Sequence, residues 1–181
     1  MLREAALENL KARNVKPGET VQLGWFVFRT IATDHGLDLE TLDFKALASF
    51  TTDFEIPERV HWAQQETLRR LGALAKDCTS RQPALVSRSY SPGSKRAFIE
   101  RGQPTNHSDS GWYVGVLGDT LDMRLASSFV HQSLYELSVR DQRLVTFWLL
   151  PVGYQVFFGD DEPRIERVEP VGIASAASPH R

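Results

Sequence analysis

The sequence predicts an α+β protein with a largely antiparallel β-sheet, a short N-terminal α/β unit and one long amphipathic helix. Three observations lead to this fold class. Residues 57–76 repeat apolar side chains with the period of about 3.6 residues that is typical of a helix. Residues 79–170 consist of short β-like runs that turn residues separate. Residues 1–78 combine a helix-like stretch with an aromatic and β-branched run.

The N-terminal α/β unit, residues 1–78, is predicted from two elements that precede the long helix. Residues 2–13 indicate a short helix, because their apolar side chains share one side and a Pro17-Gly18 turn follows. Val21–Ile31 (VQLGWFVFRTI) is apolar at both alternating sets of positions. This pattern predicts one strand that is buried on both sides.

The long helix is predicted over Pro57–Lys76. Proline suits the first helical position, where the amide N–H has no partner within the helix. Glu66 and Arg70 are four residues apart, which fits an ion pair on the polar side. The opposite side carries an apolar stripe made of Val60, Ala63, Thr67, Leu68, Leu71, Leu74 and Ala75.

The β-rich region, residues 79–170, is predicted to open with a hairpin. Its strands are Ala84–Tyr90 and Lys95–Arg101, and the intervening SPGS is the turn. Residues 120–133 fit either a short helix or a loop, and residues 171–181 are small and polar and predict a flexible tail. Further strands are predicted at Gly111–Leu117, Tyr135–Val139, Val145–Leu150, Gly153–Phe158 and Arg164–Val168.

Composition and charge exclude several classes of protein. The 181 residues are 41% hydrophobic and 24% charged, as in an ordinary soluble globular protein. The net charge of −2 argues against nucleic-acid binding, for which a basic domain is typical. No apolar run approaches the roughly 20 residues that span a bilayer, and the N-terminus lacks the apolar core of a signal peptide. With one cysteine, Cys78, we expect a cytoplasmic protein without nucleic-acid or membrane partners, and its oligomeric state stays open.

No catalytic, metal or cofactor pattern is found in the sequence. The five histidines lack the spacing of a metal site. Cys78 has no histidine near it in sequence, which favours a quiet thiol over a nucleophile. Ser110 lacks the strand–turn–helix context of a nucleophile elbow, and no helix follows Gly111, Gly115 and Gly118 to bind phosphate. We therefore expect no catalytic residue, no metal and no cofactor.

The segment NHSDSGWYVGVLGD, residues 106–119, fits a turn followed by a strand. Asn, Asp and Ser side chains bond to their own backbone in such turns. Trp112, Val114 and Val116 then alternate inward, and Gly115 leaves room for a bulky side chain from a neighbouring strand. We interpret the segment as architecture rather than as a loop that holds a ligand.

Acidic side chains provide the candidate partner-binding residues. Asp160, Asp161 and Glu162 lie together at a predicted hairpin tip, where like charges are stable only in contact with water. Asp119 and Asp122 follow another predicted strand and are expected at the surface, because isolated carboxylates resist burial. These five residues predict an acidic surface that suits a basic partner.

The stretches ALVSRSY and AFIERGQPTNHSDSGWYVGVLGD combine Arg-x-x-Pro, Asp-Ser-Gly-Trp and Gly-Asp. The residues concerned are Arg101, Pro104, Asp109, Ser110, Gly111, Trp112, Gly118 and Asp119. The combination resembles the Imm33-like family of bacterial immunity proteins, also described as a DUF2185 domain, and implies that residues 79–170 are such a β-rich domain. Relatives commonly continue into an acidic Glu-x-x-Glu-Tyr stretch, whereas this chain has Thr120–Arg124. The departure implies a different contact surface or target.

The resemblance implies an immunity protein that binds a cognate toxin or secreted effector of interbacterial competition, without catalysis. Neutralisation would be occlusion of the toxin's active site by an interface of about 800 Å² on each partner, with aromatic anchors and an acidic rim. One alternative is a small-molecule or peptide-binding regulatory module with an aromatic pocket around Trp25 and Trp112, although core packing is the simpler interpretation of both tryptophans. The other alternative is an enzyme whose active site is formed by residues that lie far apart in the sequence.

Overall fold

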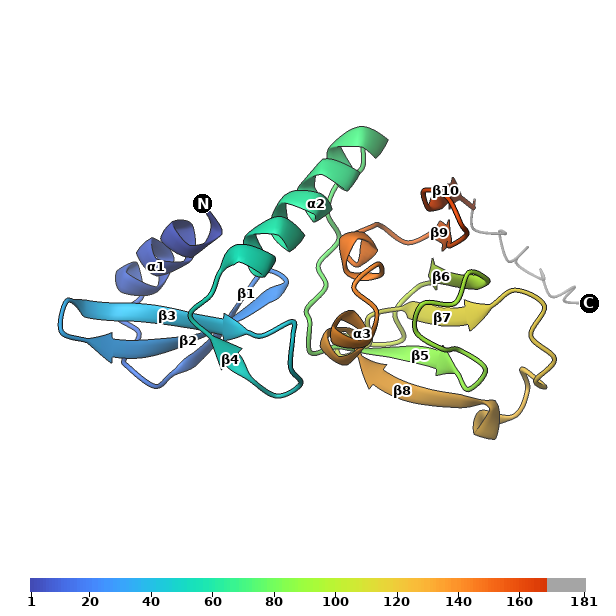
Figure 1. The fold of residues 1–181 in the computed structure, drawn as a ribbon, viewed down its shortest axis with the longest axis horizontal. Coiled ribbons are helices and arrows are strands. Elements are labelled where there is room, and N and C mark those ends of the chain that lie inside the picture. The colour runs from blue at the N-terminus through green and yellow to red at the C-terminus, as the bar shows by residue number, and fades with distance from the viewer. Residues whose placement is uncertain (169–181) are drawn as a thin grey trace, which may run out of the picture.

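A computed structural model of the chain describes residues 1–168, which form two β-sheets and three α-helices (Figure 1). One sheet has four antiparallel strands in the order β1-β2-β3-β4. The other has six strands in the order β10-β9-β6-β7-β5-β8, and its neighbours are antiparallel except for β5 and β7. The predicted α+β fold class is confirmed, whereas the predicted flexible tail, residues 171–181, lies outside the described residues. None of the helices within residues 1–168 has the length and apolar character that a membrane crossing requires.

The N-terminal part consists of α1 (Leu2–Ala12) and the four-stranded sheet. The strands are β1 (Thr20–Leu23), β2 (Phe26–Thr33), β3 (Gly36–Leu42) and β4 (Phe50–Thr51). The prediction of one strand over Val21–Ile31 is wrong, because the chain turns at Gly24-Trp25 and Leu23 pairs with Phe26. Gly24 has a φ of 57°, which glycine adopts without steric cost, and two-residue turns of this kind join antiparallel strands tightly.

The predicted long helix is α2 (Glu55–Leu71), which is 17 residues long. It ends before Lys76, because Gly72 adopts a left-handed φ of 59° and its amide bonds back to the last turn. Leu74, which the predicted stripe included, lies beyond this end and is 87% exposed.

The apolar stripe of α2 packs into the core along its helical part. Val60 and Leu68 are buried, as the periodicity predicts. On the polar side, Glu66 pairs with Arg69 at 2.6 Å rather than with Arg70, so the ion pair spans three residues instead of four.

The six-stranded sheet follows α2. Its strands are β5 (Pro83–Ser87), β6 (Ala97–Arg101), β7 (Trp112–Val116), β8 (Phe129–Ser133), β9 (Tyr154–Phe157) and β10 (Arg164–Arg167). The predicted hairpin of β5 and β6 is wrong, because β7 lies between them and pairs with both. Hairpin loops usually have about 2–5 residues, whereas residues 88–96 separate these strands. This connection packs against the buried Asp141 instead of forming a tight turn. The Asp141 carboxylate accepts hydrogen bonds from Tyr90 Oη at 2.8 Å and Gly93 N at 2.9 Å.

The prediction of strands at residues 135–139 and 145–150 is wrong, because both segments contain helices. Residues 120–133, for which the sequence favoured a short helix or a loop, contain a 3₁₀-helix and the strand β8. The helices of this region are η1 (Ala126–Ser128), α3 (Leu134–Arg140) and η2 (Val145–Phe147).

A capping box explains why α3 begins where β8 ends. Ser133 Oγ accepts a hydrogen bond from Glu136 N at 3.1 Å, and the Glu136 carboxylate accepts one from Ser133 N at 2.9 Å. The reciprocal pair satisfies amide groups that the first turn of a helix leaves without partners. Local capping therefore outweighs the strand preference of the tyrosine and valine that follow.

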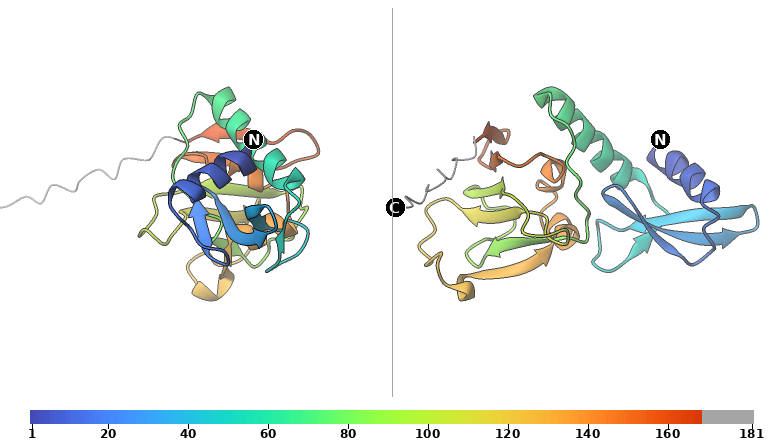
Figure 2. Two further views of the ribbon diagram at one scale, coloured as in Figure 1. Left: turned by 90° about the vertical axis from the view of Figure 1, so that its left-hand side faces the viewer. Right: turned by 180° about the vertical axis from the view of Figure 1, so that it is seen from behind.

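The two sheets lie at opposite ends of α2 and share one core (Figure 2). Gln64 Nε2 on α2 donates a hydrogen bond to Val145 O of η2 at 2.9 Å. Ser80 N, just before β5, donates one to Trp25 O in the β1–β2 turn at 3.1 Å. The division of the chain into separate units at residue 78 stays a prediction.

The packing of α2 predicts that Leu68→Ala lowers the free energy of unfolding by about 2–5 kcal/mol, because it leaves a cavity in the core. Leu68 is 5% exposed. The matched control, Leu74→Ala, makes the same change at an exposed position and should cost less than about 0.5 kcal/mol. Urea denaturation of both variants measures the two values, and equal losses would contradict this packing.

Candidate binding surface

The motif residue Arg101 lies inside the protein at the end of β6 and is 1% exposed. Its guanidinium donates hydrogen bonds to four backbone carbonyl oxygens. The acceptors are Leu150 O at 2.7 Å, Asp77 O at 3.1 Å, and Ser110 O and Trp148 O at 3.2 Å each. Burial lowers the pKa of Arg101, although the group stays charged because the usual pKa of arginine is very high. A planar guanidinium suits this place, since its five N–H groups point in fixed directions.

Asp109 closes the loop that precedes β7. Its carboxylate accepts hydrogen bonds from Thr105 N at 2.8 Å, from Thr105 Oγ1 at 3.0 Å and from Gly111 N at 2.8 Å. Burial opposes ionisation, but these hydrogen bonds stabilise the charged form more strongly and lower the pKa of Asp109. One side chain thereby joins the two ends of the loop.

Ser110 and Gly111 attach the same loop to its neighbours. Ser110 Oγ donates a hydrogen bond to Pro83 O at 2.6 Å. Gly111 has a φ of 74°, and a Cβ atom there would lie 2.5 Å from Gly102 O and 3.3 Å from Pro104 Cδ. Only glycine fits this conformation and this close approach of two backbone segments.

Trp112 and Gly118 are two further motif positions. The Trp112 side chain is 1% exposed, and its Nε1 donates a hydrogen bond to Trp148 O at 3.1 Å. The two indole rings meet edge to face with their centroids 5.2 Å apart. Gly118 has a φ of 71°, and a Cβ atom there would collide with the Arg96 guanidinium. Segment 106–119 is therefore tied into the fold by its motif residues rather than arranged around an open site.

The acidic turn, Asp160–Glu162, joins β9 to β10 and is exposed along its length. Asp160 forms an ion pair with Lys95. Asp122 lies in the loop between β7 and β8 and pairs with Arg124, whose Nε is 3.1 Å from its Oδ1. Asp160 and Asp122, two of the five candidate partner-binding acids, thus form ion pairs with basic neighbours at the surface.

Asp119 makes its hydrogen bonds within the protein. Its carboxylate accepts them from Ser87 Oγ at 2.5 Å, from Ser89 Oγ at 2.8 Å and from Leu121 N at 3.0 Å. These bonds, that from Ser87 most, lower the pKa of Asp119. The residue fixes the start of the loop, residues 117–128, that leads to β8.

The strand order determines how the acidic groups lie relative to one another. β7 and β9 both run antiparallel to β6, so both finish at the same end of the sheet. Asp119 follows β7 and Asp160 follows β9, while Lys95 and Arg96 precede β6 and lie between them. Charges of both signs therefore alternate along this end of the sheet.

The outer face of the six-stranded sheet carries four half-buried rings, Phe157, Phe98, Tyr113 and Phe129, which we call the aromatic row. Ring centroids are 6.0 Å apart for Phe157 and Phe98, and 5.6 Å apart for Phe98 and Tyr113. They are 6.1 Å apart for Tyr113 and Phe129. Gly115 lies beneath, and a Cβ atom there would be 2.7 Å from Tyr113 Cε1 and 2.8 Å from Phe98 Cε1. The glycine leaves room for both rings, as its place within a strand predicts.

The aromatic row faces away from the helices. The neighbouring residues Ile99, Val114 and Val156 point to the opposite face and are fully buried in the core with α3 and η2. Met123, which is 50% exposed, extends the row, since its Sδ lies 3.9 Å from Tyr113 Oη. An apolar patch with a charged border is typical of an interaction surface.

Sequence reasoning missed the aromatic row. Its four members come from four strands, β9, β6, β7 and β8, and become neighbours only through the order of the sheet. The available signal was alternation, because Phe98 lies on the opposite face from the buried Ala97 and Ile99. That signal identifies an outward ring in one strand but not its neighbours in the others.

Cys78 offers little nucleophilic chemistry. The side chain is buried, and burial raises the pKa of Cys78 to about 11, although the charge of Arg101 acts in the opposite direction. A thiol with this pKa is protonated at neutral pH, whereas the thiolate is the reactive form. Within residues 1–168, no group of three or more histidine, cysteine, aspartate or glutamate side chains lies close enough to hold a metal ion.

We predict that Arg101→Lys lowers the free energy of unfolding by about 2–4 kcal/mol. The ammonium group keeps the charge but cannot reach four carbonyl groups in separate segments, and a buried group without a partner costs about 1–3 kcal/mol. Arg81→Lys is the matched control at an exposed position and should cost less than about 0.5 kcal/mol. If urea denaturation gave the two variants equal stability, Arg101 would not have this role.

The raised pKa of Cys78 predicts slow labelling by a disulfide reagent in the native state. At pH 8 the rate should be lower by about 100-fold than in concentrated urea, where exposure returns the thiol to an ordinary pKa. The release of the coloured thiolate of Ellman's reagent measures both rates, with Cys78→Ser as the blank. Fast labelling of the native protein would revive the enzyme alternative.

The chain matches one protein-family model, and the matched region contains the motif and the aromatic row. The model of the Imm33-like domain matches residues 63–168, which include the whole six-stranded sheet. No curated protein and no solved structure matches the chain. The matched range is more than half of the 181 residues and agrees with the resemblance of the motif. The chain therefore belongs to the Imm33-like domain family, a family of immunity proteins.

Proposed function

We propose that this protein is an immunity protein that binds a cognate bacterial toxin or secreted effector and neutralises it by covering its active site. Family membership supports the class of partner. The observation that carries the proposal is the aromatic row, an apolar patch on the outer face of the sheet, because such patches mark sites of protein association. The proposed mechanism is stoichiometric binding in the cytoplasm, where a lone Cys78 stays reduced.

The aromatic row supplies the centre of the proposed interface. Aromatic side chains carry much of the binding energy of interfaces, and their few rotatable bonds keep the entropic cost low. Phe98 and Tyr113 hold each other in place above Gly115, which favours a preorganised surface. An interface of about 800 Å² on this partner would extend from the row to the loops at the end of the sheet.

The acidic turn and Asp122 supply part of the proposed rim. The turn begins three residues after Phe157, and Asp122 precedes the exposed Met123. Rim charges chiefly raise the association rate, and they do so most at low salt. A toxin that acts on nucleic acid commonly carries a basic surface to attract phosphates, so such a partner would be steered toward this rim. Asp119 contributes by holding the loop that carries Asp122.

Rescue of cells that express the cognate toxin tests the proposed surface. The toxin is first identified by mass spectrometry of proteins that co-purify with the tagged chain. Phe98→Ala with Tyr113→Ala should weaken the complex by at least about tenfold and reduce rescue, because it removes the central rings. Lys at all three positions of the acidic turn should slow association by about tenfold at low salt and by less at high salt.

Leu74→Ala is the control, since it changes an exposed apolar residue away from the sheet and should leave rescue and affinity unchanged. Thermal melting confirms that each variant is folded before binding is measured. Full rescue and wild-type affinity with the aromatic variant would refute the proposed centre. Unchanged association rates with the charge-reversed variant would refute the proposed rim.

A further inference from the structure

Strand β8 is an edge strand of the six-stranded sheet, since it pairs with β5 and with no other strand of residues 1–168. Figure 1 shows it along the margin of the sheet, on the side away from β10. The outer side of an edge strand has backbone N–H and C=O groups that no neighbouring strand binds. Such a strand can therefore pair with a strand of another chain.

The register of β8 determines which of its backbone groups point outward. Arg88 N donates a hydrogen bond to Ser128 O, just before β8, at 3.0 Å. Along an antiparallel pair of strands, residues that exchange hydrogen bonds alternate with residues that do not. Val130, two residues after Ser128, therefore bonds to β5, whereas the backbone groups of Phe129 and His131 point away from β5.

Helix α3 closes the outer side of β8 after these two residues. Ser133 also points away from β5, but its N–H donates a hydrogen bond to the Glu136 carboxylate at 2.9 Å. As the N-cap residue it uses its carbonyl oxygen for the first hydrogen bond of the helix. The N–H and C=O groups of Phe129 and His131 remain, and within residues 1–168 they have no hydrogen-bond partner. We call these four groups the free edge.

Strand β8 lacks the features that usually prevent edge strands from pairing between chains, which are charged side chains, proline and short length. Its sequence, FVHQS, contains no proline, lysine, arginine, aspartate or glutamate. At the opposite edge of the same sheet, three of the four residues of β10 are charged. The edge strands of the other sheet are shorter, with four residues in β1 and two in β4. Among these edges, β8 is the one best suited to pairing.

We propose that β8 pairs with β8 of a second copy of this chain, antiparallel and about a two-fold axis at Val130. Phe129 of one copy would face His131 of the second copy, and each such pair would exchange two hydrogen bonds. The four bonds would use every group of the free edge in both copies. The edge is complementary to itself in this register, as a closed two-fold contact requires.

The side chains of β8 suit this register. Phe129 and His131 lie on the outer face, because alternate residues of a strand share a face, so their rings would contact each other across the two copies. The two Val130 side chains would meet on the inner face, at a position where opposite side chains come closest. The charged residues that line the hollow beside Val130 are Arg88 and Arg140, which belong to other elements. The strand surfaces that would meet are thus uncharged.

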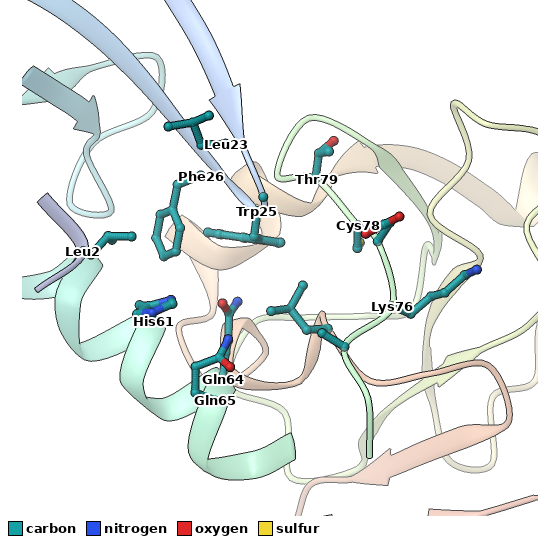
Figure 3. A pocket seen from close by; sticks show the side chains of 14 residues that line it. Leu2, Leu23, Trp25, Phe26, His61, Gln64, Gln65, Lys76, Cys78 and Thr79 are labelled. Carbon is teal, nitrogen blue, oxygen red and sulfur yellow. The ribbon is translucent and has the colours of Figure 1, made fainter. Parts of the chain in front are cut away.

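The proposal goes beyond the immunity role and does not depend on it. The two six-stranded sheets would join into one, with the aromatic rows of both copies on the same face. The N-terminal part would not take part in the pairing. Its cavity of about 410 Å³, where Figure 3 shows Trp25 and Phe26, is lined by no residue of β8.

Sedimentation velocity of the full chain tests the pairing, and the chain should form a dimer with a dissociation constant of about 100 µM or tighter. His131→Pro removes an N–H of the free edge but no bond to β5, so it should weaken the dimer by at least about tenfold. His131→Thr keeps this N–H and should weaken the dimer by less than about threefold. Trp62→Ala removes an exposed ring on α2 and should leave the dimer unchanged.

Disulfide formation tests the position of the axis, with Cys78→Ser as the background. Val130→Cys would place two thiols opposite each other, where Cα atoms are about 4.5 Å apart and within reach of a disulfide. Gln132→Cys is the matched control, because its two copies would lie about 14 Å apart along the strands. After mild oxidation, non-reducing electrophoresis should show a covalent dimer for Val130→Cys alone.

A chain that sediments as a monomer at millimolar concentration would overturn the proposal. A dimer that His131→Pro leaves unchanged, or that Trp62→Ala abolishes, would overturn it too, since another surface would then form the contact. Thermal melting shows whether each variant is folded. If His131→Pro does not fold, the disulfides decide, and a covalent dimer that forms as readily with Gln132→Cys as with Val130→Cys would exclude the axis at Val130.

Discussion

The four hydrogen bonds of the buried Arg101 guanidinium are the constraint on which the six-stranded sheet depends. Their acceptors belong to the chain after α2, to the loop before β7 and to the stretch between η2 and β9, which no strand pairing holds. Carbonyl groups in such segments must find partners when they are buried. One side chain satisfies all four, and Trp112 Nε1 adds a second bond to Trp148 O. The segments that cover the inner face of the sheet are thereby attached to its central strands.

This arrangement separates the buried motif residues from those proposed to touch a partner. Arg101, Ser110 and Trp112 are buried and serve the inner face. The aromatic row and the acidic turn lie on the outer face and at the end of the sheet, where a substitution disturbs little of the core. One framework can therefore carry surfaces for different partners.

The sequence predicts the elements whose signals are local. The apolar period of α2 and the glycine at position 72 are both local signals, but apolar residues at Leu74 and Ala75 continue the period past the end of the helix. Ser133 and Glu136 have the spacing of a capping box, which predicts a helix start. The β-prone residues between and after them predict a strand instead. The order of β5, β7 and β6 depends on contacts such as Tyr90 with Asp141, 51 residues apart. No local pattern reveals such contacts, so neither the sheet order nor the aromatic row that it assembles could be predicted.

The position of α2 across both sheets determines where the chain can be divided without loss of its core. The family match begins at residue 63, inside this helix. A fragment starting there would lack Val60 and the helix start, and Ser80 N would lose its acceptor on Trp25. The region that matches the family model, residues 63–168, is thus shorter than the part of the chain that forms the shared core. The matched range and the packed core therefore have different boundaries in this chain, and the four-stranded sheet contributes to the packing of the matched region.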